Sequence, residues 1–311
     1  MISAVIVHMG QKYPEYLSNC IEQFFLFNKD TKLHCIVEYD FEQLNDLSNK
    51  FQNLNIVKTC SLTKTKEHKF FLTFNRLTRS TWRGGFWRYV VERFFTLYDF
   101  MKTYNVENIL HFEYDNLIYC DIKTISSQFE KKKDLCIICD SDERCVPGVV
   151  FIPQKDNLKS FCKFYNRNYT LFPNNDMVAF SKYSKKNQMC NFLPVIPPEY
   201  LEEKKILKSQ IGKTSKNPNM FCKEFSNFNY LFDAAAFGQY IGGIDKRNDD
   251  NQNSNEHFIN EEALYDPSVF QFIWKMDSNN LKKPYLIFKN KEFLLFNLHI
   301  HSKNLKKFMS N

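Results

Sequence analysis

The amino-acid sequence predicts an α/β fold with a mostly parallel sheet and helices on both faces. Two observations lead to this prediction. Short apolar runs of strand length alternate with amphipathic segments of helical period between residues 2 and 112. Of the 311 residues, 43% are hydrophobic and 16% aromatic, which is enough to form a large core. Alternating strands and helices are typical of a parallel sheet that is covered on both faces.

The first part of the chain shows the alternation most clearly. The apolar run at 2–8 predicts a strand, and the segment 13–28 carries apolar residues at helical spacing. Two glycines, Gly84 and Gly85, stand before a long amphipathic segment, as expected at the start of a helix. The other elements expected here are strands at 32–39, 54–59 and 107–112, helices at 41–53 and 84–105, and a polar loop with short structure at 61–80.

The second part of the chain is less regular. Its expected elements are strands at 135–140, 148–153, 269–275, 284–289 and 292–300, helices at 156–169 and 234–243, a polar loop at 245–257, and a short basic C-terminal helix. Only eight glycines occur in the chain, and Gly238, Gly242 and Gly243 are clustered. Such a cluster indicates helix capping, a tight turn or a close approach of the backbone to a ligand.

The charges and cysteines exclude several classes of protein. The formal net charge is +7, which fits either a solvated basic surface or a basic cleft for an anionic ligand. Because no basic run is interleaved with aromatic residues as in an RNA-binding motif, no nucleic-acid partner is expected. Ten scattered cysteines contain one CxxC, Cys136 to Cys139, without a second, so buried reduced thiols of a cytoplasmic protein are expected rather than a zinc site. No apolar run is long enough to predict a membrane span.

An acidic pair, Glu113 and Asp115, follows the predicted strand at 107–112 in the stretch HFEYDNLIYCDI. In an open α/β sheet, ligands bind beyond the carboxyl ends of the strands. The two carboxylates are two residues apart, so an extended backbone directs them to the same side. Oxygen ligands of this kind suit a hard divalent cation. The alternative is a solvated turn at the end of the strand.

With this pair in place, the sequence resembles glycosyltransferases of the GT-A fold. The segments that carry the resemblance are FWRYVVERFF, HFEYDNLIY, FDAAAFGQYIGG and NLHIHSK, and it extends from about residue 1 to residue 308. Enzymes with these segments are found in giant DNA viruses of the mimivirus type and in some bacteria, and the Lys-, Asn- and Phe-rich composition suits such an AT-rich genome. The resemblance implies a mixed, mostly parallel sheet in a single domain, 1–311. Residues 1–120 would bind the nucleotide sugar, and 121–311 the acceptor.

The resemblance also implies site residues. Glu113, directly or through water, and Asp115 would hold Mn²⁺ or Mg²⁺, although the motif here is Glu-x-Asp rather than Asp-x-Asp. A late histidine, His299 or His301, would be a third ligand. Residues that would contact the donor are Arg88, Arg93, Glu113, Tyr114 and Lys303. Arginine suits phosphate because its planar fork binds two oxygens at once. The alternative for Arg88 and Arg93 is pairing with acids such as Glu92.

A carboxylate near the acceptor hydroxyl is needed if the enzyme inverts the anomeric centre. Asp233 is the first candidate and Glu261, with its neighbour Glu262, the second; the alternative for Asp233 is capping the Ala-rich helix that follows it. A retaining enzyme would need no such base, and the sequence leaves the stereochemistry and the oligomeric state open.

The predicted function is metal-dependent transfer of a hexose from a nucleoside diphosphate sugar, with a UDP-sugar as the default, to a hydroxyl of a glycan or protein. The location would be the cytoplasm, or the host cytoplasm or virion for a viral protein. Three alternatives are a sugar-nucleotide pyrophosphorylase, a non-catalytic nucleotide- or sugar-binding module with a degenerate GT-A site, and a nucleic-acid-binding protein.

Overall fold

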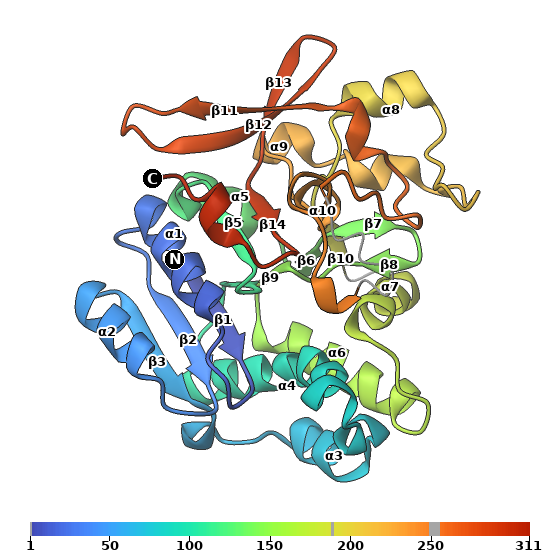
Figure 1. Cartoon of the computed structure of the whole chain (residues 1–311). Helices are drawn as coiled ribbons and strands as arrows, with labels where there is room; N and C mark the ends of the chain where they lie inside the picture. Colours follow the sequence, from blue (N-terminus) through green and yellow to red (C-terminus); the bar gives the residue numbers. More distant parts are fainter. Residues whose placement is uncertain (1, 188–189, 249–255) are drawn as a thin grey trace.

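A computed structural model of the chain describes residues 2–187, 190–248 and 256–311. Its centre is a seven-stranded sheet with the strand order β10-β6-β9-β4-β1-β2-β3 (Figure 1). Six strands are parallel to one another and β9 alone runs against its neighbours β4 and β6. The strands are β1 Ser3–His8, β2 Leu33–Val37, β3 Leu54–Lys58, β4 Ile109–Phe112, β6 Leu135–Ile137, β9 Val149–Ile152 and β10 Cys190–Phe192.

Helices cover both faces of this sheet. The connections β1-α1-β2 and β2-α2-β3 place α1 and α2 on one face, and the return from β3 to β4 places α4 on the other, as right-handed crossovers require (Figure 1). Helix α6 packs on α4 and β9, and α3 packs on both helices. The bounds are α1 Glu15–Phe27, α2 Glu42–Lys50, α3 Lys66–Phe74, α4 Phe86–Tyr104 and α6 Lys155–Tyr169. The predicted fold class, a mixed and mostly parallel α/β sheet, is confirmed.

Smaller sheets complete the second part of the chain. Strand β5 pairs antiparallel with β14, β7 pairs with β8, and β11 to β13 form a three-stranded antiparallel sheet at the top of Figure 1. The strands are β5 Asn116–Ile118, β7 Cys139–Ser141, β8 Arg144–Cys145, β11 Gln271–Met276, β12 Lys282–Phe288, β13 Lys291–Leu294 and β14 Asn297–His299. The remaining helices are α5 Ser126–Glu130, α7 Asp176–Asn187, α8 Pro198–Lys204, α9 Phe225–Phe228 and α10 Ala236–Gly242.

Several predicted elements differ from the observed ones. The polar segment 61–80 contains the nine-residue helix α3, because His68 and Phe71 are buried and Thr65 caps the first turn. Helix α7 was not predicted at all. The expected C-terminal helix is a single 3-10 turn, η8 (Leu305–Phe308). Of the predicted polar loop at 245–257, residues 249–255 lie outside the described part.

All ten cysteines are free thiols; Cys60 is exposed, Cys190 is half-buried, and the others are buried. The prediction of buried, unbridged thiols is therefore confirmed except at Cys60 and Cys190, which are unbridged but not buried. Among the described residues, no helix combines the length and the apolar character needed to cross a membrane.

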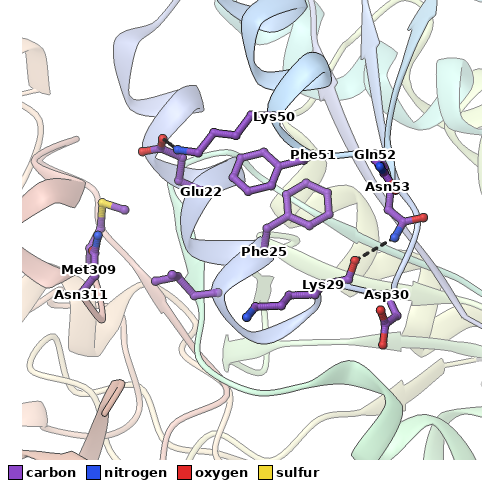
Figure 2. A pocket seen from close by; sticks show the side chains of 11 residues that line it. Glu22, Phe25, Lys29, Asp30, Lys50, Phe51, Gln52, Asn53, Met309 and Asn311 are labelled. Carbon is purple, nitrogen blue, oxygen red and sulfur yellow. Dashed lines mark hydrogen bonds and ion pairs between the residues drawn. The ribbon is translucent and has the colours of Figure 1, made fainter. Parts of the chain in front are cut away.

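One cavity of about 460 Å³ lies between the end of α1, the turn from α2 to β3 and the last residues of the chain (Figure 2). Phe25 stacks on Phe51 with 4.5 Å between ring centroids, and Lys50 forms an ion pair of 2.7 Å with Glu22 at its margin. Its lining residues Lys29, Asp30 and Asn53 come just before β2 and β3, so the cavity lies at the amino ends of these strands. This cavity is therefore at the edge of the sheet opposite to the acidic pair.

Candidate active site

The acidic pair lies in the turn that joins β4 to β5. The backbone N–H of Asn116 donates to the carbonyl of Glu113 at 3.0 Å and closes this turn. Strand β14 pairs with β5 so that His299 lies opposite Asn116, and the N–H of Ile300 donates to the carbonyl of Asp115 at 2.8 Å. The register of this short ladder thus places His299 against a carboxylate that is 184 positions earlier in the sequence.

Glu113, Asp115 and His299 form one cluster of metal-ligating side chains. Each offers a ligand atom within 4.8 Å of the other two. The imidazole Nε2 lies 3.2 Å from Asp115 Oδ2 and 3.7 Å from Glu113 Oε2. Bonds from Mg²⁺ or Ca²⁺ to oxygen are about 2.0–2.6 Å long, so this spread matches the ligands of a single ion. The two carboxylates suit Mn²⁺ or Mg²⁺, and the imidazole favours the transition metal Mn²⁺ of the two, so the residues present fit the predicted metal.

Two cations neutralise the acidic pair. Lys303 Nζ is in direct contact with Asp115 Oδ2, and Arg93 contacts Glu113 through Nη1. Arg93 is buried and its other terminal nitrogen donates to Asp176 at 2.7 Å. Lys303 adopts a φ of 67°, a left-handed conformation that costs a non-glycine residue about 1 kcal/mol or more. The backbone of the turn after β14 is therefore strained at Lys303, the residue whose side chain reaches the cluster.

The charges in this cluster shift its titration strongly. Although burial opposes ionisation, the positive charges of His299 and Lys303 hold the pKa of Asp115 well below its usual range. Burial lowers the pKa of His299, but the charge and hydrogen bond of Asp115 outweigh it, so the net shift is upward. The pKa of Lys303 shifts in the same way. Burial lowers it, but the negative charges of Asp115 and Glu113 raise it by more, so the net shift is upward. Binding of a metal would require the neutral imidazole and would free the Lys303 ammonium from Asp115.

Two glycines leave room for His299. A Cβ atom on Gly148 would lie 2.8 Å from the ring atom Nδ1 of His299, and one on Gly238 would lie 2.0 Å from its carbonyl oxygen. Both spacings are too short for a real side chain. Gly238 therefore permits the close contact of α10 with β14. Of the roles expected for the 238–243 cluster, helix capping is observed at Gly243, which ends α10 with a φ of 75°, whereas the close approach at Gly238 is to the backbone of β14. The role of Gly148 was not predicted.

Asp233 lies behind β14 and is 1% exposed. Its carboxylate accepts hydrogen bonds from the backbone N–H groups of Phe237, Gly238 and His299 at 2.8–2.9 Å. Burial raises its pKa to about 6. Asp233 thus has the alternative role named above, capping α10, and it also holds β14. Its predicted role as catalytic base stays a prediction that this geometry does not favour.

The structure does not bring every predicted residue into the cluster. His301 accepts a hydrogen bond from the N–H of Asp245 at 3.0 Å and is not part of the ligand group. Arg88 donates to Glu92 at 2.6 Å, which is the alternative pairing considered from the sequence. Glu261 lies on an exposed turn, and its neighbour Glu262 pairs with Arg144 at 3.2 Å.

Tyr114 points from the motif toward the first strand and helix. Its hydroxyl lies 3.3 Å from His8 Nδ1, and its ring stacks on Tyr16 with 5.5 Å between centroids. The ammonium of Lys303 lies 5.8 Å from the Tyr16 ring. Tyr114 therefore links β1 and α1 to the cluster.

Two further residues, which the sequence analysis did not single out, hold the side chains and strands around the cluster in place. Asp176 begins α7 and pairs with Arg93, and Asn297 donates to Asn116 at 2.7 Å and accepts from the N–H of Asp233 at 3.1 Å. No local pattern marks either residue, because both act through contacts with distant segments of the chain.

Comparisons with known proteins give only distant likenesses. No family model and no curated protein matches the sequence. Among solved structures, mouse xyloside xylosyltransferase 1 is 8% identical with a TM-score of 0.42, covering 64% of this chain and 89% of that chain. The glycosyltransferase GlyE of Streptococcus pneumoniae is 11% identical with a TM-score of 0.41, covering 61% of this chain and 45% of that one.

A galactosyltransferase, LgtC, in complex with donor and acceptor sugar analogues, is 12% identical with a TM-score of 0.40, covering 65% of this chain and 78% of that one. Likenesses at this level leave the function to be argued from the residues of the site.

Proposed function

We propose that the chain is a metal-dependent glycosyltransferase that moves a sugar from a nucleoside diphosphate sugar to a hydroxyl of a glycan or protein. A UDP-sugar is the first donor to test. The observation that carries this proposal is the union of Glu113, Asp115 and His299 in one cluster, with Lys303 beside it. The cluster lies at the carboxyl end of β4, the edge where open α/β sheets bind nucleotides.

The residues of the cluster would act on the donor's diphosphate. When bound there, a divalent cation supplies a Lewis acid that offsets the charge of the leaving nucleoside diphosphate. Lys303 stays charged at neutral pH, because its pKa is raised, and its ammonium would bind a phosphate oxygen. Arg93 fixes the Glu113 carboxylate from the buried side and so limits its conformations. Asp176 in turn holds Arg93.

A second cavity supports an acceptor site in the later half of the chain. Its volume is about 1080 Å³, and it lies among β7, β8, the end of α7 and β10. Polar side chains line it, among them Ser184, Asn191 and Asn217, as an acceptor with many hydroxyl groups would need. Helix α7 begins at Asp176, beside Arg93, and reaches Ser184 eight residues or about 12 Å later. The division into a donor half, 1–120, and an acceptor half, 121–311, belongs to this proposal.

The identity of the metal as Mn²⁺ or Mg²⁺ is part of the proposal, as are a viral origin and a cytoplasmic location. The last two rest on composition and resemblance alone.

The experiment is a donor panel. Purified protein would be incubated with uridine and guanosine diphosphate sugars, with Mn²⁺ or with EDTA, and release of the nucleoside diphosphate measured. Asp115→Ala tests the cluster, and Asp46→Ala, an exposed carboxylate on α2, is the matched control. We expect slow hydrolysis of one donor that needs the metal and is lost only in Asp115→Ala. Metal-dependent binding of the nucleotide without turnover, even with a panel of glycan acceptors, would instead indicate a non-catalytic binding module.

A further inference from the structure

Exposed aromatic and aliphatic side chains gather on α3, at the start of α4 and in the connection from α6 to α7. Phe70 and Phe74 lie on α3, Trp82 lies on the 3-10 turn η3 (Trp82–Gly84), and Phe86 begins α4; their exposed fractions are 42%, 58%, 46% and 43%. Two more apolar residues, Leu171 and Phe172, lie in the connection from α6 to α7 and are 57% and 80% exposed. These elements lie at the lower end of Figure 1.

The same part of the chain carries almost all of the protein's net charge. Residues 61–90 contain seven Lys or Arg and a single acid, Glu67, which gives +6 of the formal +7 for the whole chain. Six of these cationic side chains are exposed: Lys64, Lys66, Lys69, Arg76, Arg79 and Arg83. Within the described residues, Lys66, Lys69 and Arg79 form no ion pair, so their charges remain available to an outside anion.

Contacts between segments join several of these apolar and basic residues. The N–H of Arg76 donates to the carbonyl of Thr170 at 3.1 Å, and its guanidinium lies 5.9 Å from the ring centroid of Phe172. This contact joins η2 (Arg76–Arg79) to the connection after α6. Trp82, Phe86 and Trp87 form a ring cluster with centroids 5.1–6.0 Å apart. We call the exposed apolar residues named above and the six cations the basic–aromatic patch.

A bilayer surface explains this patch better than a nucleic acid does. Nucleic-acid bases need open ring faces on which to stack. The Trp82 ring instead already stacks on Trp87, parallel to it within 14°, and has the Arg83 guanidinium 4.5 Å from its centroid, so part of its face is occupied. Leu171 and Phe172 project from a connection, as residues that enter the headgroup region do. Exposed apolar side chains within a basic surface are typical of proteins bound to anionic lipid.

We propose that the basic–aromatic patch binds the surface of an anionic lipid bilayer. The projecting apolar side chains would enter the headgroup region, and the surrounding lysines and arginines would pair with the lipid phosphates and carboxylates. Helix α4 begins in the patch at Phe86 and reaches Arg93, beside the metal cluster, seven residues or about 10 Å later. Docking here would therefore hold the candidate active site close to the membrane, whatever reaction it performs.

The test is co-sedimentation of the full chain with vesicles of phosphatidylcholine alone and of phosphatidylcholine with phosphatidylserine. We expect binding only to the anionic vesicles, and weaker binding at high salt. The double substitution Leu171→Ser and Phe172→Ser should weaken binding at least about tenfold, and Arg79→Gln about fivefold. Ile206→Ser, 64% exposed on another surface, and Lys131→Gln are the matched controls and should change nothing.

Circular dichroism would establish that each variant is folded. Equal binding to both kinds of vesicle, or binding that these substitutions leave unchanged, would overturn the proposal. A single-stranded oligonucleotide serves as a competing ligand. If it bound more tightly than the vesicles, and the same substitutions abolished that binding, the patch would be a nucleic-acid site and the proposal would be wrong.

Discussion

The two strands that meet at the candidate active site are held in different ways. Strand β4 lies in the middle of the seven-stranded sheet, pairs on both sides and is buried along its whole length. Strand β14 has three residues and, among the described residues, pairs with β5 alone; the Asp233 carboxylate, the Asn297 amide and the close approach of Gly238 fix it. The apolar core therefore positions Glu113 and Asp115, whereas a buried polar network positions His299 and Lys303.

The largest effect is expected at the metal cluster, where residues positioned by the apolar core meet residues positioned by the polar network. Asp115→Ala removes a ligand and the partner of Lys303, so kcat/KM for the preferred donor should fall by about three orders of magnitude or more. The chain should stay folded, because β4 keeps its apolar contacts. The measurement is steady-state donor hydrolysis with saturating Mn²⁺. Activity within tenfold of wild type would remove Asp115 from the metal site.

The substitution Asp233→Ala disrupts the buried polar network that holds β14. Three buried N–H groups, those of Phe237, Gly238 and His299, lose their acceptor, so the free energy of unfolding should fall by about 3 kcal/mol. Denaturant unfolding measures this change, and Mn²⁺ titration measures the accompanying loss of affinity. A variant with wild-type stability and metal affinity but no turnover would instead support Asp233 as the catalytic base.

A smaller and purely steric effect is expected from Gly148→Ala. The added Cβ would lie 2.8 Å from His299 Nδ1, so the ring must move and the Mn²⁺ affinity should fall about 10- to 100-fold. Gly242→Ala is the matched control, since the nearest neighbours of its Cβ would be side-chain atoms of Phe308 and Ser302 at 3.3–3.5 Å. Calorimetric titration of Mn²⁺ compares the two. Equal affinities would show that the ring of His299 can tolerate the shift.

The smallest effect concerns a buried cluster of one imidazole and two carboxylates between α3 and α4. His68 lies 2.5 Å from Asp99 Oδ2 and 3.3 Å from Glu92 Oε1. Burial lowers the pKa of His68, but the hydrogen bonds to these two carboxylates raise it by more than burial lowers it. The net shift of the pKa is therefore upward from 6.5. The charged imidazole therefore stabilises the fold fully below pH 6.5, and this stabilisation is lost as pH rises through the raised pKa.

His68→Gln should cost about 1–2 kcal/mol of unfolding free energy near pH 6, and less as the pH approaches about 9. Denaturant unfolding of both proteins across this range gives the difference. A cost that grows with pH would contradict the assignment of a charged His68.

The strands of the first half could be predicted because their signal is local. The apolar runs at β1 to β4 and the helical period of α1, α2 and α4 appear in the sequence itself, and Glu113 and Asp115 follow directly from the end of β4. The metal-ligating histidine could be narrowed only to His299 or His301. The choice depends on the β5–β14 register, which pairs residues about 180 positions apart.

Asp176, Asn297 and Gly148 were missed for the same reason. Each acts through one contact with a distant segment, and no short window of sequence contains both partners. Helix α3 was missed because its segment is mostly polar: only His68 and Phe71 are buried, and packing on α4 and α6 stabilises it.

The central claim is that two segments far apart in sequence form one divalent cation site. The most direct test is the binding of Mn²⁺, followed by electron paramagnetic resonance, to the wild type, Asp115→Ala, His299→Ala and the control His301→Ala, each with and without uridine diphosphate. We predict that Asp115→Ala and His299→Ala both lose binding, and that His301→Ala retains it. Undiminished Mn²⁺ binding in His299→Ala would contradict the account, because β14 would then hold no part of the metal site.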